Sequence, residues 1–229
     1  MTGPRAALIR HGAYHQRVDT PSALQPYPLT EEGEAQARRC GEELAKVIER
    51  DGLVLHGVVF CSRQLRAWQT AQIACEVLID HGHKVEVVQT PALAERSVGS
   101  AANLTLDEIE RILEADPRFE MPPPGWKSDS DYCLPLQGAE SLMMAGVRVA
   151  SLLKETLKDR PAGSLTLFFG HGASFRHAAH LLGVLTRDEI SRFSMYRAKP
   201  LQLCHNPDGT WAHSGGKWKI RQAKENALD

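Results

Sequence analysis

Short apolar runs alternate with stretches of helical periodicity along this chain. The runs at 6–9, 58–61 and 165–169 are bounded by glycine or polar residues, and the segment 84–88 alternates apolar with charged residues. Runs of this length predict strands, and the three apolar runs fit the centre of a sheet. Because strands that alternate with helices pair in parallel, the pattern predicts an α/β fold.

Five longer stretches carry apolar residues at helical spacing. We expect helices to begin near Glu31, Leu65, Thr105, Ser141 and Ala173. Thr105 with Glu108 forms a capping-box pattern, and a short helix follows Thr186. The predicted buried faces include Leu65, Trp68, Ile73 and Val77 in the second helix, Ile109, Ile112 and Leu113 in the third, and Met143, Val147, Ala150, Leu153 and Leu157 in the fourth.

Two irregular regions complete the predicted arrangement. The segment 116–138 contains five prolines, three of them consecutive, and is therefore expected to be a loop over a binding site. Its candidates for contact with the organic part of a substrate are Arg118, Trp126, Lys127 and Tyr132, and plain surface covering is the alternative. The segments 201–204 and 211–220 predict a terminal antiparallel hairpin, followed by a polar, frayed tail at 221–229.

Composition narrows the class of protein. The chain has 229 residues, 42% hydrophobic residues and a formal net charge of −1, which favour one globular domain over 1–229 and argue against a nucleic-acid or membrane-surface binder. Its five cysteines are odd in number and lack the spacing of a zinc site, so reduced thiols are expected. The chain shows neither a signal peptide nor an apolar segment long enough to span a bilayer, and we expect a soluble, cytoplasmic protein.

Two of the predicted strands end in a histidine followed by glycine. Arg10-His11-Gly12 follows the first strand, and Gly170-His171-Gly172 follows the run 165–169. Ligands bind beyond the carboxyl ends of strands in open α/β sheets, so neighbouring strands would place two imidazoles side by side there. The alternative is a pair of capping or surface histidines. Arg66, in the first turn of its helix, is unfavourable against the helix dipole unless an anion joins it.

These residues resemble the marks of the histidine phosphatase superfamily, branch 1, the phosphoglycerate-mutase-like enzymes. Arg-His-Gly after the first strand and a second histidine after a late strand are two marks, and the run from Ser62 to Ala71 matches a third, Ser-x-x-x-Arg-Ala-x-x-Thr-Ala. The resemblance implies a three-layer α/β fold, with helices on both faces of a mostly parallel sheet, an antiparallel edge strand and an insertion at about 96–138 over the site.

The resemblance also implies the chemistry. A phosphomonoester would be hydrolysed through a phosphohistidine on His11, with Arg10, Arg66 and His171 around the phosphate and no metal or cofactor. Glu95, reached through a Leu-x-Glu run, would be the proton donor, and its alternative is a salt-bridged loop carboxylate. The substrate-binding candidates are Gly12, Tyr14, Gln16, Arg96 and Gly172.

Several alternatives stay open at this stage. One residue is inserted in the Gly-Glu-Ser run that begins the fourth helix in the family, so whether Glu140 reaches the site is unsettled. A phosphoglycerate mutase is a second possibility, but the segments that follow Arg-His-Gly in the mutases are replaced here, which favours a hydrolase. A phosphoprotein phosphatase, an inactive phosphoryl-binding module and a homodimer also remain open. His177 and His180 are expected to have structural roles.

Overall fold

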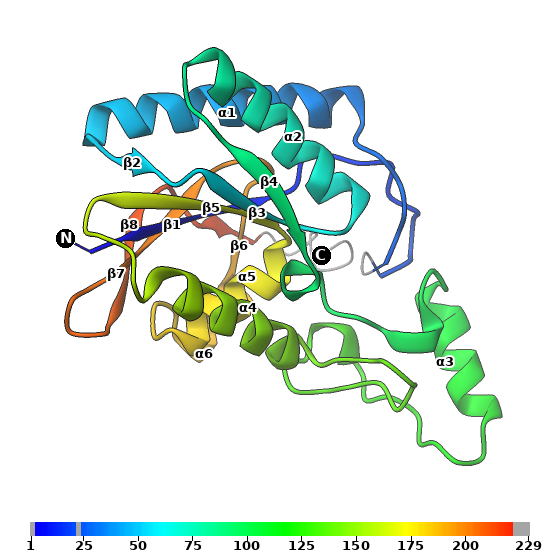
Figure 1. Ribbon diagram of the computed structural model, residues 1–229. Helices are drawn as coiled ribbons and strands as arrows, with labels where there is room; N and C mark the ends of the chain where they lie inside the picture. The colour runs from blue at the N-terminus through cyan, green and yellow to red at the C-terminus, as the bar shows by residue number, and fades with distance from the viewer. Residues whose placement is uncertain (1–2, 22–23, 222–229) are drawn as a thin grey trace.

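The computed structural model describes residues 3–21 and 24–221, which form a seven-stranded sheet covered by helices on both faces (Figure 1). The strand order is β4-β3-β5-β1-β7-β8, with the short β2 paired to β5 beside this path. The first five strands along the chain are β1 (Arg5–Arg10), β2 (Val54–Leu55), β3 (Val58–Ser62), β4 (Glu86–Thr90) and β5 (Ser164–Gly170). These pair in parallel, whereas β7 (Leu201–His205) and β8 (Trp211–Gly215) are antiparallel, as predicted for an edge.

The terminal hairpin is shorter than expected. Its second strand ends at Gly215, and the chain turns at Gly216, which has a φ of 77°. Lys219–Ile220 (β9) then pairs with Phe193–Ser194 (β6) in a separate two-stranded sheet, so the segment 211–220 is not one continuous strand. Apart from Arg221, the predicted tail at 221–229 lies outside the described residues.

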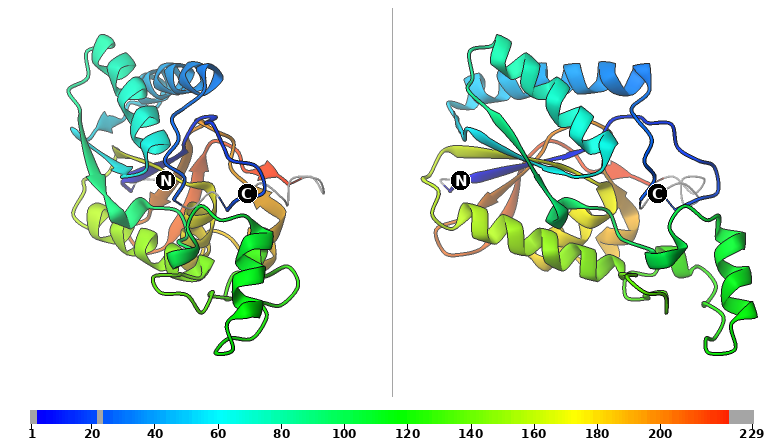
Figure 2. Two further views of the ribbon diagram at one scale, coloured as in Figure 1. Left: turned by 90° about the vertical axis from the view of Figure 1, so that its right-hand side faces the viewer. Right: turned by 45° about the vertical axis from the view of Figure 1, so that its right-hand side comes forward.

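Two pairs of helices sandwich the sheet (Figures 1 and 2). One face carries α1 (Glu31–Asp51) and α2 (Leu65–Asp80), and the other carries α4 (Leu142–Leu157) and α5 (Gly172–Leu181), with α6 (Arg187–Arg192) beside α5. A hydrophobic core lies on each face of the sheet, and alternate residues of β1 belong to one or the other. Ala7 and Ile9 pack towards α1 and α2, and Ala6 and Leu8 pack towards α4 and α5. The three-layer prediction is therefore confirmed.

The buried faces of α2 and α4 differ from the prediction. In α2, Leu65, Trp68, Ile73 and Val77 are only partly buried, and the buried residues are mostly small: Ala67, Ala71, Ala74 and Cys75. In α4, the predicted Ala150, Leu153 and Leu157 are buried, but Met143 is only partly buried and Val147 is about half exposed, and Ala145, Gly146 and Val149 are buried as well. A Cβ at Gly146 would lie 2.6 Å from His177 Cβ, and one at Gly41 would lie 2.7 Å from Val77 Cβ. Small residues are buried because neighbouring helices approach closely there, and hydrophobicity alone does not predict this.

The segment after β4 builds a small hydrophobic cluster of its own. It contains η1 (Pro91–Leu93), η2 (Gly99–Ala101), α3 (Leu106–Ala115) and η3 (Trp126–Ser128), and it extends past the carboxyl ends of the parallel strands (Figure 2). The predicted capping box of Thr105 and Glu108 is present. Ile109 and Leu113 are buried with Val98, Ala101, Trp126 and Leu134, whereas Ile112 is 41% exposed, contrary to the prediction.

Candidate active site

His11 and His171 lie side by side at the carboxyl ends of β1 and β5. The two strands pair in parallel with Arg10 opposite Gly170, and the His11 amide donates to the Gly170 carbonyl at 3.0 Å. The ring centroids are 5.2 Å apart, and both side chains are buried. The prediction that the two strand ends would bring these imidazoles together is confirmed.

His11 is held in one tautomer. Its Nδ1 lies 2.8 Å from the Gly12 carbonyl, which can only accept, so Nδ1 carries the proton and Nε2 keeps its lone pair. Burial, reinforced by the charges of Arg66 and Arg10, lowers the pKa of His11 well below its ordinary value. The ring is therefore neutral near pH 7, which is the state a nitrogen nucleophile needs.

Arg66 is fully buried in the first turn of α2, where the sequence placed it. Its Nη1 donates to the Gln25 carbonyl at 3.0 Å, and its Nη2 lies 3.2 Å from Gln64 Oε1 and 3.3 Å from His171 Nδ1. Because an N–H of arginine donates, Nδ1 of His171 accepts. The guanidinium of Arg66 thus links the start of α2 to the second imidazole. Its positive charge, which was expected to need an anion, lies next to the ring of His171.

His171 is held from both sides of its ring and forms the N-cap of α5. While Nδ1 accepts from Arg66, its Nε2 lies 3.0 Å from Ser62 Oγ, which accepts the remaining proton. Burial, followed by the charges of Arg66, His11 and Arg10, lowers the pKa of His171 well below its ordinary value. Ser62 was recognised in the sequence only as the start of a motif, and nothing there showed that it would position His171.

Tyr14 and Arg10 lie close to His11. The Tyr14 ring meets His11 edge-on at 5.2 Å, and the Arg66 guanidinium lies 4.7 Å from its centroid. Burial raises the pKa of Tyr14, and its buried hydroxyl has no hydrogen-bond partner among the described residues. Arg10 donates from Nη1 to the Met195 carbonyl at 3.2 Å.

Glu95 lies in the extended segment that follows η1. Its Oε1 accepts hydrogen bonds from the Arg96 amide at 3.0 Å and from the Ser174 amide, in the first turn of α5, at 3.2 Å. His171 and Glu95 are thus both held at the N-terminal end of α5, where the helix dipole favours negative charge. The arrangement unites a neutral imidazole, two guanidiniums, a second imidazole and a carboxyl group.

A comparison with known protein families identifies the family of this chain. The model of the histidine phosphatase superfamily (branch 1) matches residues 6–214. The chain belongs to that superfamily. A 2,3-bisphosphoglycerate-dependent phosphoglycerate mutase of Corynebacterium glutamicum is 27% identical over 236 residues, covering 95% of this chain and 92% of the mutase, and one of Bifidobacterium longum is 28% identical over 86% of this chain and 84% of its own.

Solved structures of the superfamily share the fold. A mycobacterial glucosyl-3-phosphoglycerate phosphatase in complex with VO3 has a TM-score of 0.66 at 21% identity, covering 95% of this chain and 98% of its own. A phosphoglycerate mutase from Bacillus anthracis has a TM-score of 0.68 at 16% identity, covering 94% and 93%. Superfamily membership supports an enzyme of phosphoryl transfer or hydrolysis, since the relatives include both phosphatases and mutases.

Glu140 supports the backbone segment that carries Glu95. Its carboxylate binds Arg148 through both oxygens, each at 2.9 Å, and accepts from the Ser97 amide at 3.1 Å. Burial would raise the pKa of Glu140, but the hydrogen bonds and charge of Arg148 outweigh it, and the pKa is lowered. Arg148 in turn donates to the carbonyl of Glu95 at 3.0 Å. The open question about Glu140 is thereby answered: it holds Arg148.

The remaining substrate-binding candidates have different surroundings. The Gly12 amide donates to Thr70 Oγ1 at 3.0 Å, and a Cβ at Gly12 would lie 2.6 Å from the Gly33 carbonyl oxygen, so close backbone packing requires this glycine. A Cβ at Gly172 would lie 3.2 Å from Arg10 Cδ. Gln16 is half-buried, and its amide donates to the Tyr14 carbonyl.

The candidates in the proline-rich loop have three kinds of surroundings. Trp126 is 3% exposed in the hydrophobic cluster, with Tyr132 packed against it, and its Nε1 donates to Glu110, so it supports the insertion from within. Arg118 is exposed and pairs with Asp116. Lys127, in contrast, lines a cavity with Arg96.

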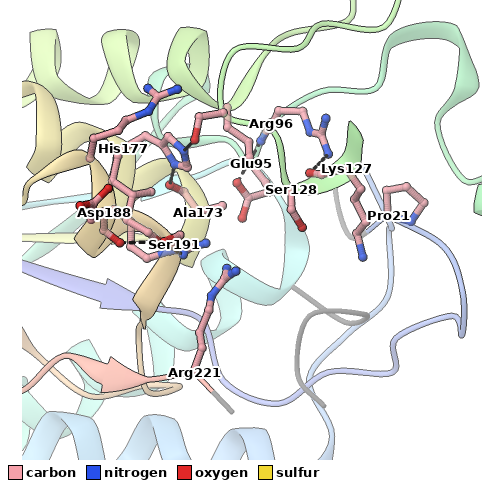
Figure 3. Close-up of a pocket in the computed structure, with 15 residues that line it drawn as sticks. Pro21, Glu95, Arg96, Lys127, Ser128, Ala173, His177, Asp188, Ser191 and Arg221 are labelled. Carbon is pink, nitrogen blue, oxygen red and sulfur yellow. Dashed lines mark hydrogen bonds between the residues drawn. The ribbon is translucent and has the colours of Figure 1, made fainter. Parts of the chain in front are cut away.

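That cavity begins at Glu95 and has a volume of about 410 Å³ (Figure 3). Its other walls come from α5 and α6, including Arg176, His177 and Arg187, which sequence reasoning had not assigned to a binding site. His177 donates from Nδ1 to the Ala173 carbonyl and accepts from Ser130 Oγ, and burial lowers its pKa to about 4. The predicted structural role of His177 agrees with these bonds.

Within residues 3–21 and 24–221, no three His, Cys, Asp or Glu side chains are grouped so that they could hold a metal ion. No helix there is both long enough and apolar enough to cross a membrane.

Proposed function

We propose that the protein is a phosphatase that hydrolyses phosphomonoesters in two steps through a phosphohistidine on His11. The observation that carries the proposal is the neutral, tautomer-fixed His11 beside the buried charge of Arg66. A phosphate dianion is attracted by Arg66 and Arg10 and by the N-terminal ends of two helices, α2 and α5. The unpartnered hydroxyl of Tyr14 supplies a further donor next to His11.

In the first step, His11 Nε2 attacks phosphorus and the bond from phosphorus to the ester oxygen breaks. Arg66, Arg10 and His171 stabilise the charge on the three equatorial oxygens. For His171 to donate from Nδ1, the Arg66 Nη2 group that donates to it at 3.3 Å turns to the phosphate instead, and the Ser62 hydroxyl turns its proton towards Nε2, 3.0 Å away. Glu95, protonated in the substrate complex, gives its proton to the departing alkoxide.

In the second step, water attacks the phosphohistidine. Glu95, now a carboxylate, takes a proton from the water, the bond from phosphorus to His11 Nε2 breaks, and inorganic phosphate leaves. The positions of the residues support this double role, because the carboxyl group of Glu95 is fastened through Oε1 alone, and its Oε2 accepts no hydrogen bond from the described residues. No step requires a metal or cofactor.

A phosphoglycerate mutase is the second candidate, because the curated relatives at 27% and 28% identity carry that name. A mutase would return the phosphoryl group to a second hydroxyl instead of water. Hydrolysis is favoured because the mutase segments after Arg10-His11-Gly12 are replaced by Ala13-Tyr14-His15-Gln16. A phosphopeptide in the same phosphate-release assay would reveal a phosphoprotein phosphatase, and an inactive binding module would release phosphate from no ester.

The test is phosphate release from p-nitrophenyl phosphate and from an alkyl phosphate. We expect His11→Asn to abolish both activities, and Glu95→Gln to reduce alkyl phosphate hydrolysis by about 100-fold or more while p-nitrophenyl phosphate, whose leaving group needs no proton, is affected far less. His15→Gln, which changes an exposed neighbouring imidazole, is the matched control. Full activity of His11→Asn would refute the proposal, and transfer to a second hydroxyl without phosphate release would favour the mutase.

A further inference from the structure

The turn between β3 and α2 lies next to several groups of the proposed mechanism. Ser62, the last residue of β3, has its Oγ 3.0 Å from His171 Nε2, and the same oxygen accepts from the Gln64 amide at 3.3 Å. Gln64 is the N-cap of α2, but its side chain makes no capping bond to the amides that begin the helix. The hydrogen bonds of this side chain therefore go to other groups.

The Oε1 atom of Gln64 joins Arg66 to Glu95. It accepts from Arg66 Nη2 at 3.2 Å and, over a longer distance of 3.4 Å, from the Glu95 amide. A side-chain amide oxygen has two lone pairs, so it can accept from both donors. One oxygen atom thus connects the guanidinium that is proposed to bind phosphate with the backbone that carries the proposed proton donor.

The bond from Arg66 to Gln64 can persist when substrate binds. Nη2 of Arg66 carries two hydrogens, and it lies within hydrogen-bond distance of both Gln64 Oε1 and His171 Nδ1. In the proposed mechanism, the donor that serves His171 turns to the phosphate. The hydrogen directed to Gln64 keeps its acceptor, so the guanidinium stays anchored while its other contact changes.

The acceptors that hold Arg66 in this way are uncharged. The Arg66 side chain is fully buried, and a buried guanidinium needs acceptors for its N–H groups. A carboxylate at position 64 would supply one, but it would also offset the positive charge and repel a phosphate dianion. The Gln25 carbonyl and the Gln64 amide oxygen accept from Arg66 without adding negative charge, which leaves its charge available to an anion.

We propose that Gln64 is a positioning residue that holds Arg66 and Glu95 at a fixed separation, so that one geometry serves both phosphate binding and protonation of the leaving group. The inference rests on the proposed function and adds to it a residue that acts through two others. Two properties of the side chain are used. Its oxygen accepts from both partners, and its lack of charge keeps Arg66 available to the phosphate.

Two variants separate these properties. Gln64→Met keeps the length of the side chain and removes the acceptor, whereas Gln64→Glu keeps an acceptor oxygen and adds a negative charge. The Kd of orthophosphate, measured by isothermal titration calorimetry, reports on Arg66. The ratio of kcat/KM for an alkyl phosphate to kcat/KM for p-nitrophenyl phosphate reports on Glu95, because only the alkoxide needs its proton.

The two variants should change different measurements. Gln64→Met should lower the ratio of alkyl to p-nitrophenyl phosphate by about threefold or more, and it should weaken orthophosphate binding by a similar factor, the worth of one hydrogen bond. Gln64→Glu should keep the ratio within about twofold of the wild-type value and weaken orthophosphate binding by about tenfold or more, because its charge lies beside the anion.

Gln72→Met is the matched control, because Gln72 is a half-buried glutamine of the same helix, about two turns beyond Gln64. It should leave the ratio and the Kd of orthophosphate unchanged. Far-UV circular dichroism shows whether each variant folds. If Gln64→Met does not fold, Gln64→Glu decides alone, and an unchanged Kd of orthophosphate in that variant would overturn the inference.

Other results would overturn the inference while leaving the hydrolase intact. One is a folded Gln64→Met protein in which kcat/KM falls equally for the two esters, since a purely structural role would not distinguish them. Another is a change in the ratio that Gln72→Met reproduces. Absence of phosphate release from every ester by the wild-type protein would instead contradict the proposed function, and the orthophosphate titrations would then still decide whether Gln64 positions Arg66.

Discussion

Replacing Arg148 with methionine tests whether a support of the backbone that carries Glu95 controls the proton donor. The guanidinium makes five hydrogen bonds: two to the Glu140 carboxylate, and three to the carbonyls of Ala92, Ala94 and Glu95 at 2.9, 2.7 and 3.0 Å. Arg148→Met would remove all five and leave a half-buried carboxylate and three carbonyls without this partner.

Two magnitudes follow from this geometry. The side chains of Arg148 and Glu140 are 23% and 21% exposed, so the free energy of unfolding should fall by about 3 kcal/mol, the lower end for a buried pair that loses one partner. Because the lost bonds hold the backbone that carries Glu95, kcat/KM for an alkyl phosphate should fall by about 10- to 100-fold. For p-nitrophenyl phosphate the loss should stay below about threefold, since its leaving group does not need Glu95.

The assay measures urea unfolding and kcat/KM on both esters. Lys158→Met is the control, because Lys158 lies at the end of the same helix and pairs with the exposed Glu155. Arg148→Lys should restore part of the activity, since it keeps the charge opposite Glu140 but cannot reach all five acceptors. Equal losses on the two esters, or no loss on the alkyl phosphate, would refute the positioning of Glu95 by Arg148.

Three further outcomes follow from buried contacts. Burial lowers the pKa of His177 to about 4, so below about pH 6.5 the unfolded chain binds a proton at this position and the folded protein does not. The free energy of unfolding should therefore fall by about 2 kcal/mol between pH 7.5 and 5 because of this residue. In urea titrations His177→Gln should lose less stability in acid by that amount, and an unchanged loss would contradict the prediction. Gly12→Ala should lower stability by about 2 kcal/mol, measured by the urea midpoint, because the new Cβ would lie 2.6 Å from the Gly33 carbonyl oxygen; an unchanged midpoint would contradict this. Ser62→Ala should reduce kcat/KM about tenfold for both p-nitrophenyl and alkyl phosphates, because it removes the hydrogen bond that orients the ring of His171, and His171 contacts the transferred phosphate in the proposed mechanism. A loss confined to one ester would contradict this prediction.

The strand pattern predicted the centre of the sheet, and it allowed the two histidines to meet on condition that their strands were neighbours, which β1 and β5 are. Runs such as 6–9 and 165–169 are apolar, apart from Thr166, because both faces of β1 and β5 are covered, and their polar ends mark the same edge. Arg66 was singled out for a related reason, since a cation in the first turn of a helix conflicts with the helix dipole unless an anion joins it.

The sequence did not predict the contacts between side chains of different helices, strands and loops. The pair of Glu140 and Arg148, the bond of Ser62 to His171 and the cations that α6 adds to the cavity join residues from separate elements, and periodicity carries no information about such partners. Trp126 illustrates the same limit: an aromatic residue in a proline-rich loop can face a ligand or fill a local cluster, and here it fills the cluster.

The most direct measurement of the central proposal is the trapping of the phosphorylated protein. Acid quenching during turnover of a radiolabelled phosphomonoester, followed by peptide mapping, should place acid-labile, alkali-stable phosphate on the peptide that contains His11. The label should be absent from His11→Asn and present in His15→Gln. Label on another residue, or hydrolysis in which no phosphorylated protein forms and His11→Asn stays active, would contradict the account.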